Sequence, residues 1–264
     1  MRRIEFRGMA QHDNTLKSVD KVFKIVEHLK TNGGKTVTEL SQELDMPKST
    51  VQVYLNTLAK NKFVVQNGAK YQIGLQFLQY GMYALWNEPV FPNVKSKVEE
   101  LADTTGELAA CFVEELGEAV YVYGTEGNRA IRTDLTMGDR SGLHCTASGK
   151  AIFAHLPEER IEEIISQRSL GRKTPQTITD PEELREELKQ IRERGHAYSR
   201  EESVEGMRSV AAPILLNGEV VCSISLAGPA NRFVGERFTA EIPDIVKGAA
   251  NEIELKLTYS ESGL

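Results

Sequence analysis

The sequence predicts an α+β fold in two domains joined by a helix, and three observations lead to that prediction. Charge is divided unevenly: residues 1–86 carry 12 Lys and Arg against 7 Asp and Glu, whereas residues 87–264 carry 20 against 31. Apolar residues have helical spacing followed by a hairpin signal in the first third, and strand-like runs mix with helical ones in the remainder. Two prolines, Pro89 and Pro92, interrupt the chain between these regions.

The first third predicts three helices and a β-hairpin, in the order of a winged helix-turn-helix. Apolar residues three and four positions apart predict a helix over Ser18–Lys30. A capping box at Thr36–Glu39 starts a short second helix. After the break at Pro47, a third helix covers Lys48–Lys60. Two apolar runs flank Asn67-Gly68, which is the strongest short hairpin signal.

The exposed face of the third predicted helix carries side chains suited to the major groove of DNA. Gln52 and Asn56 can each pair bidentately with adenine, and Val53 can touch a thymine methyl. Polar groups at the helix start and on the hairpin can hold phosphates. The candidate DNA-binding residues are Lys48, Ser49, Thr50, Gln52, Val53, Asn56, Lys70 and Tyr71. The alternative is a helical trio with an ordinary solvated face, in a protein–protein module.

A linker helix is predicted next, because apolar residues repeat at spacings of three, four and three. This seam consists of Leu75, Leu78, Met82 and Leu85. Such a/d spacing is typical of a helix that pairs with a second copy of itself. A stripe that packs on the protein's own core is the alternative.

The acidic remainder predicts a central, mostly antiparallel sheet with helices on its sides. Strands are expected at Leu108–Val113, Ala119–Tyr123, Ala130–Leu135, Ser209–Leu216 and Val220–Leu226. Helices are expected before Gly106, at Lys150–Leu156 and Glu158–Gln167, from Pro181 to Gly195, and at Ala240–Leu257, with a polar loop at Gly138–Ser148. The predicted divisions are a tail (1–15), a winged helix-turn-helix domain (16–74), a linker helix (75–88), an α+β domain (89–258) and a tail (259–264).

Several classes of protein are excluded by composition and motif. The longest uncharged run is too short and too polar for a membrane span, and the N-terminus lacks the apolar core of a signal peptide. Three isolated cysteines favour a reducing cytoplasm over a disulfide framework. A nucleophilic site would use Cys145 with His144 or His196, and a zinc site at His144 and Cys145 would need two more ligands. We expect no enzyme activity, no metal and no cofactor.

Residues Leu16–Gly81 resemble the IclR family of transcriptional regulators. The matching stretches are TVTELSQELDMPKSTVQVYLNTLAKNKFVV and YQIGLQFLQYG. The second region resembles the family's effector-binding domain, which is similar to GAF domains, in GDR at 138–140 and in LHCTASGKAIFA, IRERGHAYSREESVEGMRSVAAPI and VVCSISLAGP. Val53 stands where members of that family usually have an arginine, so this chain departs from the family pattern at that DNA contact.

A pocket for a small anion is predicted where Ala147-Ser148-Gly149 opens a helix, because free backbone N–H groups and the helix dipole favour negative charge there. The resemblance implies that an organic, sugar or aromatic acid binds beside this segment and the last strands. The candidate effector-binding residues are Ala147, Ser148, Gly149, Met207, Ser209, Ser225 and Ala227. Ala227 replaces a hydroxyl residue of some members. Arg140 and Arg208 can neutralise a carboxylate or pair with surface glutamates.

These features predict a ligand-responsive, DNA-binding transcriptional regulator, a repressor or an activator, in the cytoplasm. The expected partners are a small-molecule effector and double-stranded DNA with a pseudo-palindromic operator, bound by a homodimer that can pair into a tetramer. Two other classes are kept as alternatives: a small-molecule enzyme with a DNA-binding module, and a thiol redox sensor that uses the three cysteines.

Overall fold

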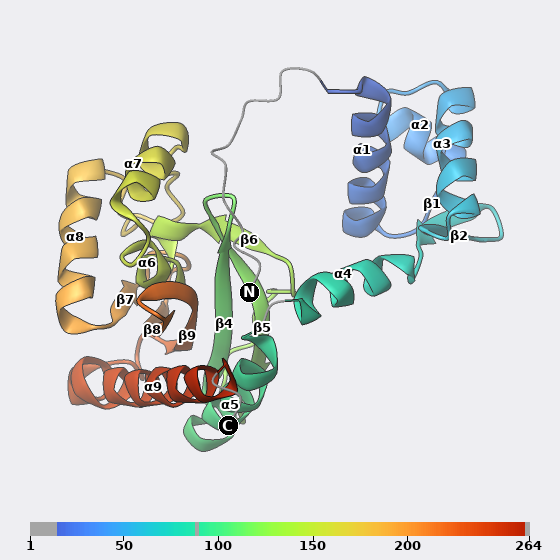
Figure 1. Cartoon of the computed structure of the whole chain (residues 1–264). Helices are drawn as coiled ribbons and strands as arrows, with labels where there is room; N and C mark the ends of the chain where they lie inside the picture. The colour runs from blue at the N-terminus through green and yellow to red at the C-terminus, as the bar shows by residue number, and fades with distance from the viewer. Residues whose placement is uncertain (1–14, 88–89, 262–264) are drawn as a thin grey trace. The chain divides into compact units, whose positions relative to one another are not determined.

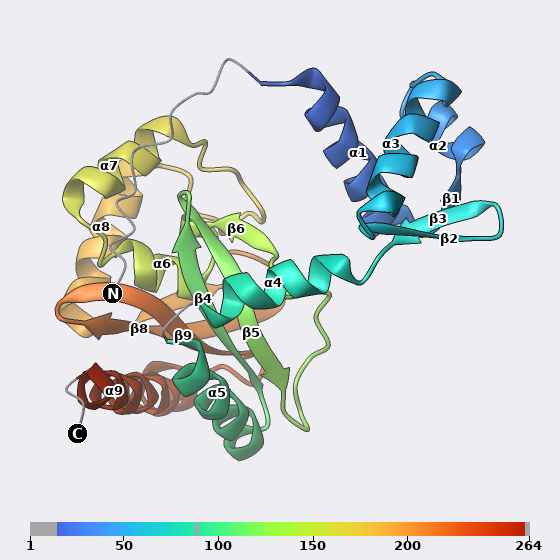
Figure 2. The same ribbon diagram turned by 45° about the vertical axis from the view of Figure 1, so that its right-hand side comes forward.

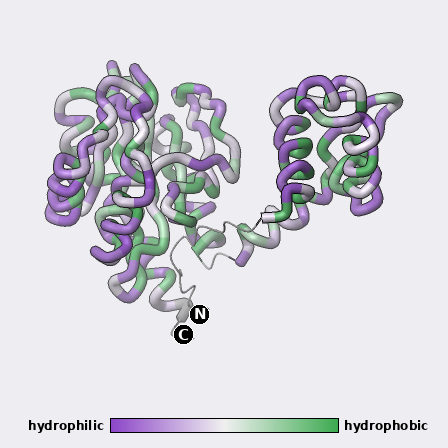
Figure 3. The backbone as a smooth tube through the Cα atoms, turned by 90° about the horizontal axis from the view of Figure 1, so that it is seen from above, coloured by the Kyte–Doolittle hydropathy of each residue, from purple (hydrophilic) through white to green (hydrophobic). Residues whose placement is uncertain are grey.

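The computed structural model describes residues 15–87 and 90–261, which form two compact units divided between these ranges (Figure 1). Parts of the predicted tails (residues 1–14 and 262–264) and the predicted boundary at Pro89 lie outside the described residues. In each unit, hydrophilic and hydrophobic stretches alternate along the helices (Figure 3), as expected for helices that each cover a core with one face.

The first unit has the predicted helices and hairpin. Its helices are α1 (Lys17–Asn32), α2 (Val37–Glu43), α3 (Lys48–Lys60) and α4 (Gln76–Trp86). Its strands are β1 (Lys35–Thr36), β2 (Val64–Asn67) and β3 (Lys70–Ile73), in the antiparallel order β1-β3-β2. The predicted capping box is confirmed: the Glu39 amide donates to the Thr36 hydroxyl, and the Thr36 amide donates to the Glu39 carboxylate. The two-residue strand β1 was not predicted.

The second unit is built on a six-stranded antiparallel sheet, in the order β6-β5-β4-β9-β8-β7. The strands are β4 (Leu108–Glu115), β5 (Glu118–Glu126), β6 (Arg140–Gly142), β7 (Ala197–Arg200), β8 (Met207–Leu216) and β9 (Glu219–Pro229). The two edge strands, β6 and β7, have only three and four residues.

Helices cover both faces of this sheet (Figure 2). The helices α5 (Phe91–Thr105) and α9 (Ile242–Glu261) lie side by side on one face, where Ala109 and Cys111 point. On the other face, where Ala110 and Phe112 point, lie α6 (Ala147–Phe153), α7 (Glu158–Gln167) and α8 (Pro181–Arg194). Because side chains alternate along a strand, neighbouring residues along most of β4, β8 and β9 belong to opposite layers.

Two sequence predictions about this unit were wrong, one strand was missed, and the last helix extends beyond its predicted end. Ala130–Leu135 is not a strand. Ile131 and Leu135 are exposed, so the alternating apolar side chains of this segment do not pack on a core. The edge beside β5 is taken instead by β6, which lies in the predicted loop Gly138–Ser148. β7 was missed, because its four residues are too few to show a pattern. The predicted tail at 259–264 starts inside α9, which runs to Glu261 and follows a π-helical segment at Arg237–Glu241.

A buried lysine joins α6 to two other segments. All seven residues of α6 are buried, and Lys150 is fully buried among them. Its Nζ lies 2.6 Å from Glu202 Oε2 and 3.4 Å from Glu187 Oε1. Glu187 also lies 2.8 Å from Arg194 Nη2. A buried charge is tolerated only when it is paired, so this network fixes α6 against α8 and the segment after β7.

Replacing Lys150 with methionine will destabilise the second unit. The substitution keeps an apolar chain of similar length but leaves Glu187 and Glu202 without their shared cation, at a cost of about 3–5 kcal/mol. Urea unfolding followed by circular dichroism measures this. The control is Lys189→Met on the exposed side of α8, which should change stability by about 0.5 kcal/mol or less. Equal unfolding midpoints for the two variants would contradict the role of Lys150.

Candidate functional site

The predicted DNA-binding residues of α3 share one face of that helix. Val51, Leu55 and Leu58 are buried in the core of the first unit. The opposite side therefore faces outward, and Val53 is 60% exposed there. Lys48, Ser49 and Asn56 are also exposed, whereas Thr50 and Gln52 are half-buried, and Lys70 is exposed on β3. The helix presents mixed polar and apolar groups of the kind that read base edges.

Tyr71 does not lie on the surface as the other candidate residues do. On β3, Lys70 and Gln72 point outward, so alternation turns the Tyr71 ring into the core, where it is 6% exposed. Its hydroxyl accepts a hydrogen bond from Gln52 Nε2 at 3.2 Å. The same Nε2 donates to Asn56 Oδ1 at 2.9 Å. Gln52 and Asn56 are therefore bonded to each other, which the prediction of two independent bidentate contacts did not include.

The predicted seam of α4 is not uniform. Leu75 and Leu78 are exposed, at 84% and 59%, whereas Met82 and Leu85 are half-buried. Nearer the hairpin, Phe63 packs against the rings of Phe77 and Tyr80. Large apolar side chains exposed in a row are typical of a surface that contacts another protein. Pairing of α4 with a second copy remains a prediction.

The predicted effector-binding residues of β8 and β9 lie on the sheet face that α6 covers. Ser209 pairs with Ala227, and Ser225 pairs with Ala211, which belongs to the core layer beneath α6. Ser225 is buried and its hydroxyl donates to the Ala110 carbonyl at 3.3 Å. The sheet thus brings together side chains that come from separate predicted segments.

The start of α6 is more closed than the sequence suggested. Ala147, Ser148 and Gly149 are all buried. The Gly149 amide, which was expected to be free for an anion, donates to the Thr146 hydroxyl at 2.9 Å. A Cβ on Gly149 would lie 2.4 Å from the Leu143 carbonyl oxygen. Glycine is therefore required here because the chain packs on itself.

Two further serines on this face were missed by sequence reasoning. Ser199 on β7 pairs with Ser209, and Ser223 lies two residues before Ser225 on β9. Both side chains are buried, and neither hydroxyl has a hydrogen-bond partner within the described chain. The alternation of β9 could have revealed Ser223, whereas Ser199 depended on recognising β7. Strands β7, β8 and β9 therefore place four serines on this face, and the buried hydroxyls of Ser199 and Ser223 have unused hydrogen-bonding capacity.

The two candidate arginines are used elsewhere. Arg140 forms ion pairs with Glu115 and Glu118. Arg208 follows Met207 on β8 and points to the opposite face from Ser209, where it donates to the Phe233 carbonyl at 3.0 Å and lies 3.5 Å from Glu201. The predicted alternative, pairing with surface glutamates, describes both residues.

Cys145 and His144 are adjacent in space as well as in sequence. A 3₁₀ turn over Leu143–Cys145 brings the Cys145 Sγ within 3.2 Å of His144 Nε2. Burial raises the pKa of Cys145 to about 11, and burial also lowers the pKa of His144. The pair is thus a neutral thiol beside a neutral imidazole, which is the opposite of an activated nucleophile.

The described residues contain no cluster of three or more His, Cys, Asp or Glu side chains that can hold a metal ion. Within residues 15–87 and 90–261, no helix combines the length and apolarity needed to cross a membrane.

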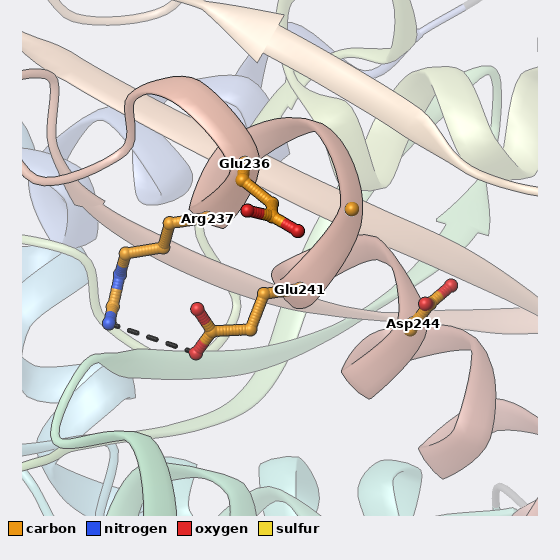
Figure 4. Close-up of a pocket in the computed structure, with 5 residues that line it drawn as sticks. Glu236, Arg237, Glu241 and Asp244 are labelled. Carbon is orange, nitrogen blue, oxygen red and sulfur yellow. Dashed lines mark ion pairs between the residues drawn. The ribbon is translucent and has the colours of Figure 1, made fainter.

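A surface hollow lies at the start of α9, and none of the residues that line it was predicted as a site residue (Figure 4). It is lined by Glu236, Arg237, Ala240, Glu241 and Asp244. Arg237 lies 3.9 Å from Glu241 and also bonds to Glu107, a fully buried carboxylate that Arg232 holds as well. The arginines therefore neutralise Glu107, which gives them a structural role.

Comparison with known proteins identifies both units. The family described as "IclR helix-turn-helix domain" matches residues 18–68, and "Bacterial transcriptional regulator IclR C-terminal" matches residues 82–255. The probable HTH-type transcriptional regulator ArcR of Halobacterium salinarum is 33% identical over 247 residues, which cover 92% of this chain and 94% of that protein.

Solved structures show the same arrangement of elements. The IclR protein of Thermotoga maritima matches with a TM-score of 0.78 and 32% identity, over 91% of this chain and 98% of that one. An IclR homologue of Microbacterium hydrocarbonoxydans, solved with 4-hydroxybenzoate, matches in fold with a TM-score of 0.76 and 21% identity, over 92% of this chain and 99% of that one. A winged helix-turn-helix followed by a GAF-like domain defines a class of transcriptional regulators. The chain belongs to the IclR family.

Cys145 should resist alkylation in the folded protein. With a pKa of about 11, about one thiol in a thousand is ionised at pH 8, and the thiolate is the reactive form. Iodoacetamide labelling at pH 8, read by mass spectrometry, should modify Cys145 only after denaturation. The denatured chain is the control for reagent activity. Rapid labelling of the folded protein would instead support the nucleophile or redox-sensor alternatives.

Proposed function

We propose that the chain is a ligand-responsive regulator in which a small molecule bound by the second unit alters the binding of the first unit to operator DNA. The observation that carries the proposal is the exposed polar face of α3, held by a buried opposite face in a family of helix-turn-helix regulators. We assign DNA binding to residues 16–74, linkage to 75–88 and effector binding to 89–258. Enzyme activity is not part of the proposal, and a regulator of this kind works beside the DNA, in the cytoplasm.

On DNA, α3 enters the major groove and basic residues fix its position. Lys48 at the first residue of α3 and Lys70 on β3 are exposed and contact phosphates, while Gln52, Val53 and Asn56 face base edges. The apolar side chains of α4 pair with a second copy. A two-fold dimer then reads two half-sites about 10 base pairs apart or a multiple of that distance.

In the second unit, the sheet face beneath α6 binds the effector. Ser209 and Ser225 supply hydroxyl groups, with Met207, Ala227 and the start of α6 around them. The structure of the Microbacterium homologue with 4-hydroxybenzoate supports a small organic or aromatic acid as the ligand class. The ligand shifts the population between two arrangements of the dimer, so ligand affinity and operator affinity are coupled reciprocally.

Replacing Lys48 or Lys70 with alanine should weaken operator binding and its salt dependence together. Each lost phosphate contact releases fewer counterions, so the slope of log K against log salt should fall by about 0.9 per contact. Titrations of the full chain at several salt concentrations measure the slope. Lys189→Ala, in the second unit, is the control and should leave the slope unchanged. Unchanged slopes in the Lys48 and Lys70 variants would remove these residues from the interface.

Replacing Ser209 with leucine should abolish stabilisation by the effector while DNA binding remains. The larger apolar side chain fills space on the α6 face and removes a hydroxyl that contacts the ligand. A thermal-shift screen of organic, sugar and aromatic acids identifies the stabilising ligand for the wild-type chain. Ser166→Leu, on exposed α7, is the matched control. A full ligand-induced shift in the Ser209 variant would place the effector elsewhere.

A further inference from the structure

One side-chain amide on α3, that of Gln52, has both of its N–H hydrogens occupied within the protein. The Gln52 Nε2 carries two hydrogens, and each has an acceptor within the protein: Asn56 Oδ1 at 2.9 Å and Tyr71 Oη at 3.2 Å. A bidentate contact with adenine needs an amide N–H for N7 as well as the amide oxygen for the amino group. Gln52 therefore has only its Oε1 left for DNA.

Asn56 is left with the complementary half of its amide. Its Oδ1 is occupied by Gln52, whereas its Nδ2 has no partner among the described residues. Gln52 and Asn56 are four residues apart, so they lie about 6 Å from each other along the axis of α3. One outward acceptor and one outward donor thus lie side by side, at a spacing of about one to two base steps of about 3.4 Å each.

Tyr71 is the group that keeps this pair in one orientation. Its ring is held in the core and its hydroxyl oxygen accepts from Gln52, so the hydroxyl's own proton is directed elsewhere. When a DNA phosphate accepts that proton, Tyr71 can only accept from Gln52. The contact of Tyr71 with the DNA backbone therefore keeps the Gln52 Nε2 on Tyr71 and leaves the Gln52 Oε1 for the bases.

We propose that Tyr71 is a positioning residue that fixes Gln52 as a hydrogen-bond acceptor and Asn56 as a donor toward the major groove. Gln52 then reads the amino group of an adenine or a cytosine, and Asn56 reads an acceptor such as a purine N7. Neither side chain makes the bidentate adenine contact that its residue type allows. This proposal rests on the proposed DNA-binding function and adds the chemistry of the bases that are read.

The first experiment identifies the bases. The full chain selects an operator from a randomised double-stranded DNA library, and Gln52→Ala locates the base pair at which discrimination is lost. At that base pair, an analogue without the exocyclic amino group should lower wild-type affinity about tenfold, the value of one good hydrogen bond. A 7-deazapurine there should change affinity less than twofold. Equal loss with both analogues would show a bidentate contact and overturn the proposal.

The second experiment tests Tyr71. Tyr71→Phe keeps the buried ring and removes one phosphate contact, so it should weaken binding to all DNA to the same small extent. It should in addition reduce discrimination at the Gln52 base pair about tenfold. In a Gln52→Ala background the same change should have no further effect on discrimination. Tyr54→Phe is the control, because this tyrosine also packs on the core from α3 and its hydroxyl has no hydrogen-bond partner in the described chain.

The outcomes distinguish failure of the positioning role of Tyr71 from failure of the proposed DNA-binding function. If the wild-type chain binds no DNA from the library, the proposed function fails. If it binds and Tyr71→Phe weakens all sequences equally, then Tyr71 is only a phosphate contact or a core residue, and the positioning role fails. If Tyr71→Phe still reduced sequence discrimination in the Gln52→Ala background, the positioning role would also be overturned.

Discussion

Both faces of the central strands of the six-stranded sheet are buried, and this requirement places the side chains of those strands. Strands β4, β8 and β9 are covered on one side by α5 and α9 and on the other by α6, α7 and α8. Residues such as Val210 and Ala211 are neighbours in sequence but belong to different layers. The serines of β8 and β9 all lie in the layer beneath α6. Ser223 and Ser225 are two residues apart on β9, so they point to the same face, and Ser209 on β8 pairs with Ala227, which is two residues after Ser225. That layer is where the structure concentrates short side chains and hydroxyl groups.

In the first unit, the single helix α3 supplies both a buried face and an exposed face. α3 gives three apolar residues to the core, and a helix that buries one side must expose the other. The polar residues on that exposed side are not independent, however, because Tyr71 reaches Gln52 from the hairpin. The core of the unit and the exposed face of α3 are therefore linked through the buried ring of Tyr71, which is how a scaffold restricts the rotamers of a side chain such as Gln52.

The strongly periodic elements could be predicted from the sequence, whereas contacts that depend on the fold could not. Helices α1, α3 and α8 carry caps, breaks and apolar spacing that act locally, and the predictions for them were confirmed. Ala130–Leu135 failed because alternation predicts a strand only where a partner strand and a core exist. The Gln52–Tyr71 bond joins residues 19 positions apart, and Lys150 meets Glu202 across 52, so no local pattern reveals them. The candidate effector face was located by family resemblance, and Ser199 and Ser223 were added only by strand register.

The short edge strands have a consequence for how copies of this protein meet. β6 and β7 offer three and four residues of unpaired backbone, which is too little for another chain to extend the sheet stably. Arg200 and Arg208 face each other across β7 and β8, so a strand approaching that edge also meets two adjacent positive charges. Assembly by strand addition, which is also the usual route to aggregation, is therefore disfavoured. Contacts between copies through this unit then rely on side chains of helices and loops, which can be selective and reversible.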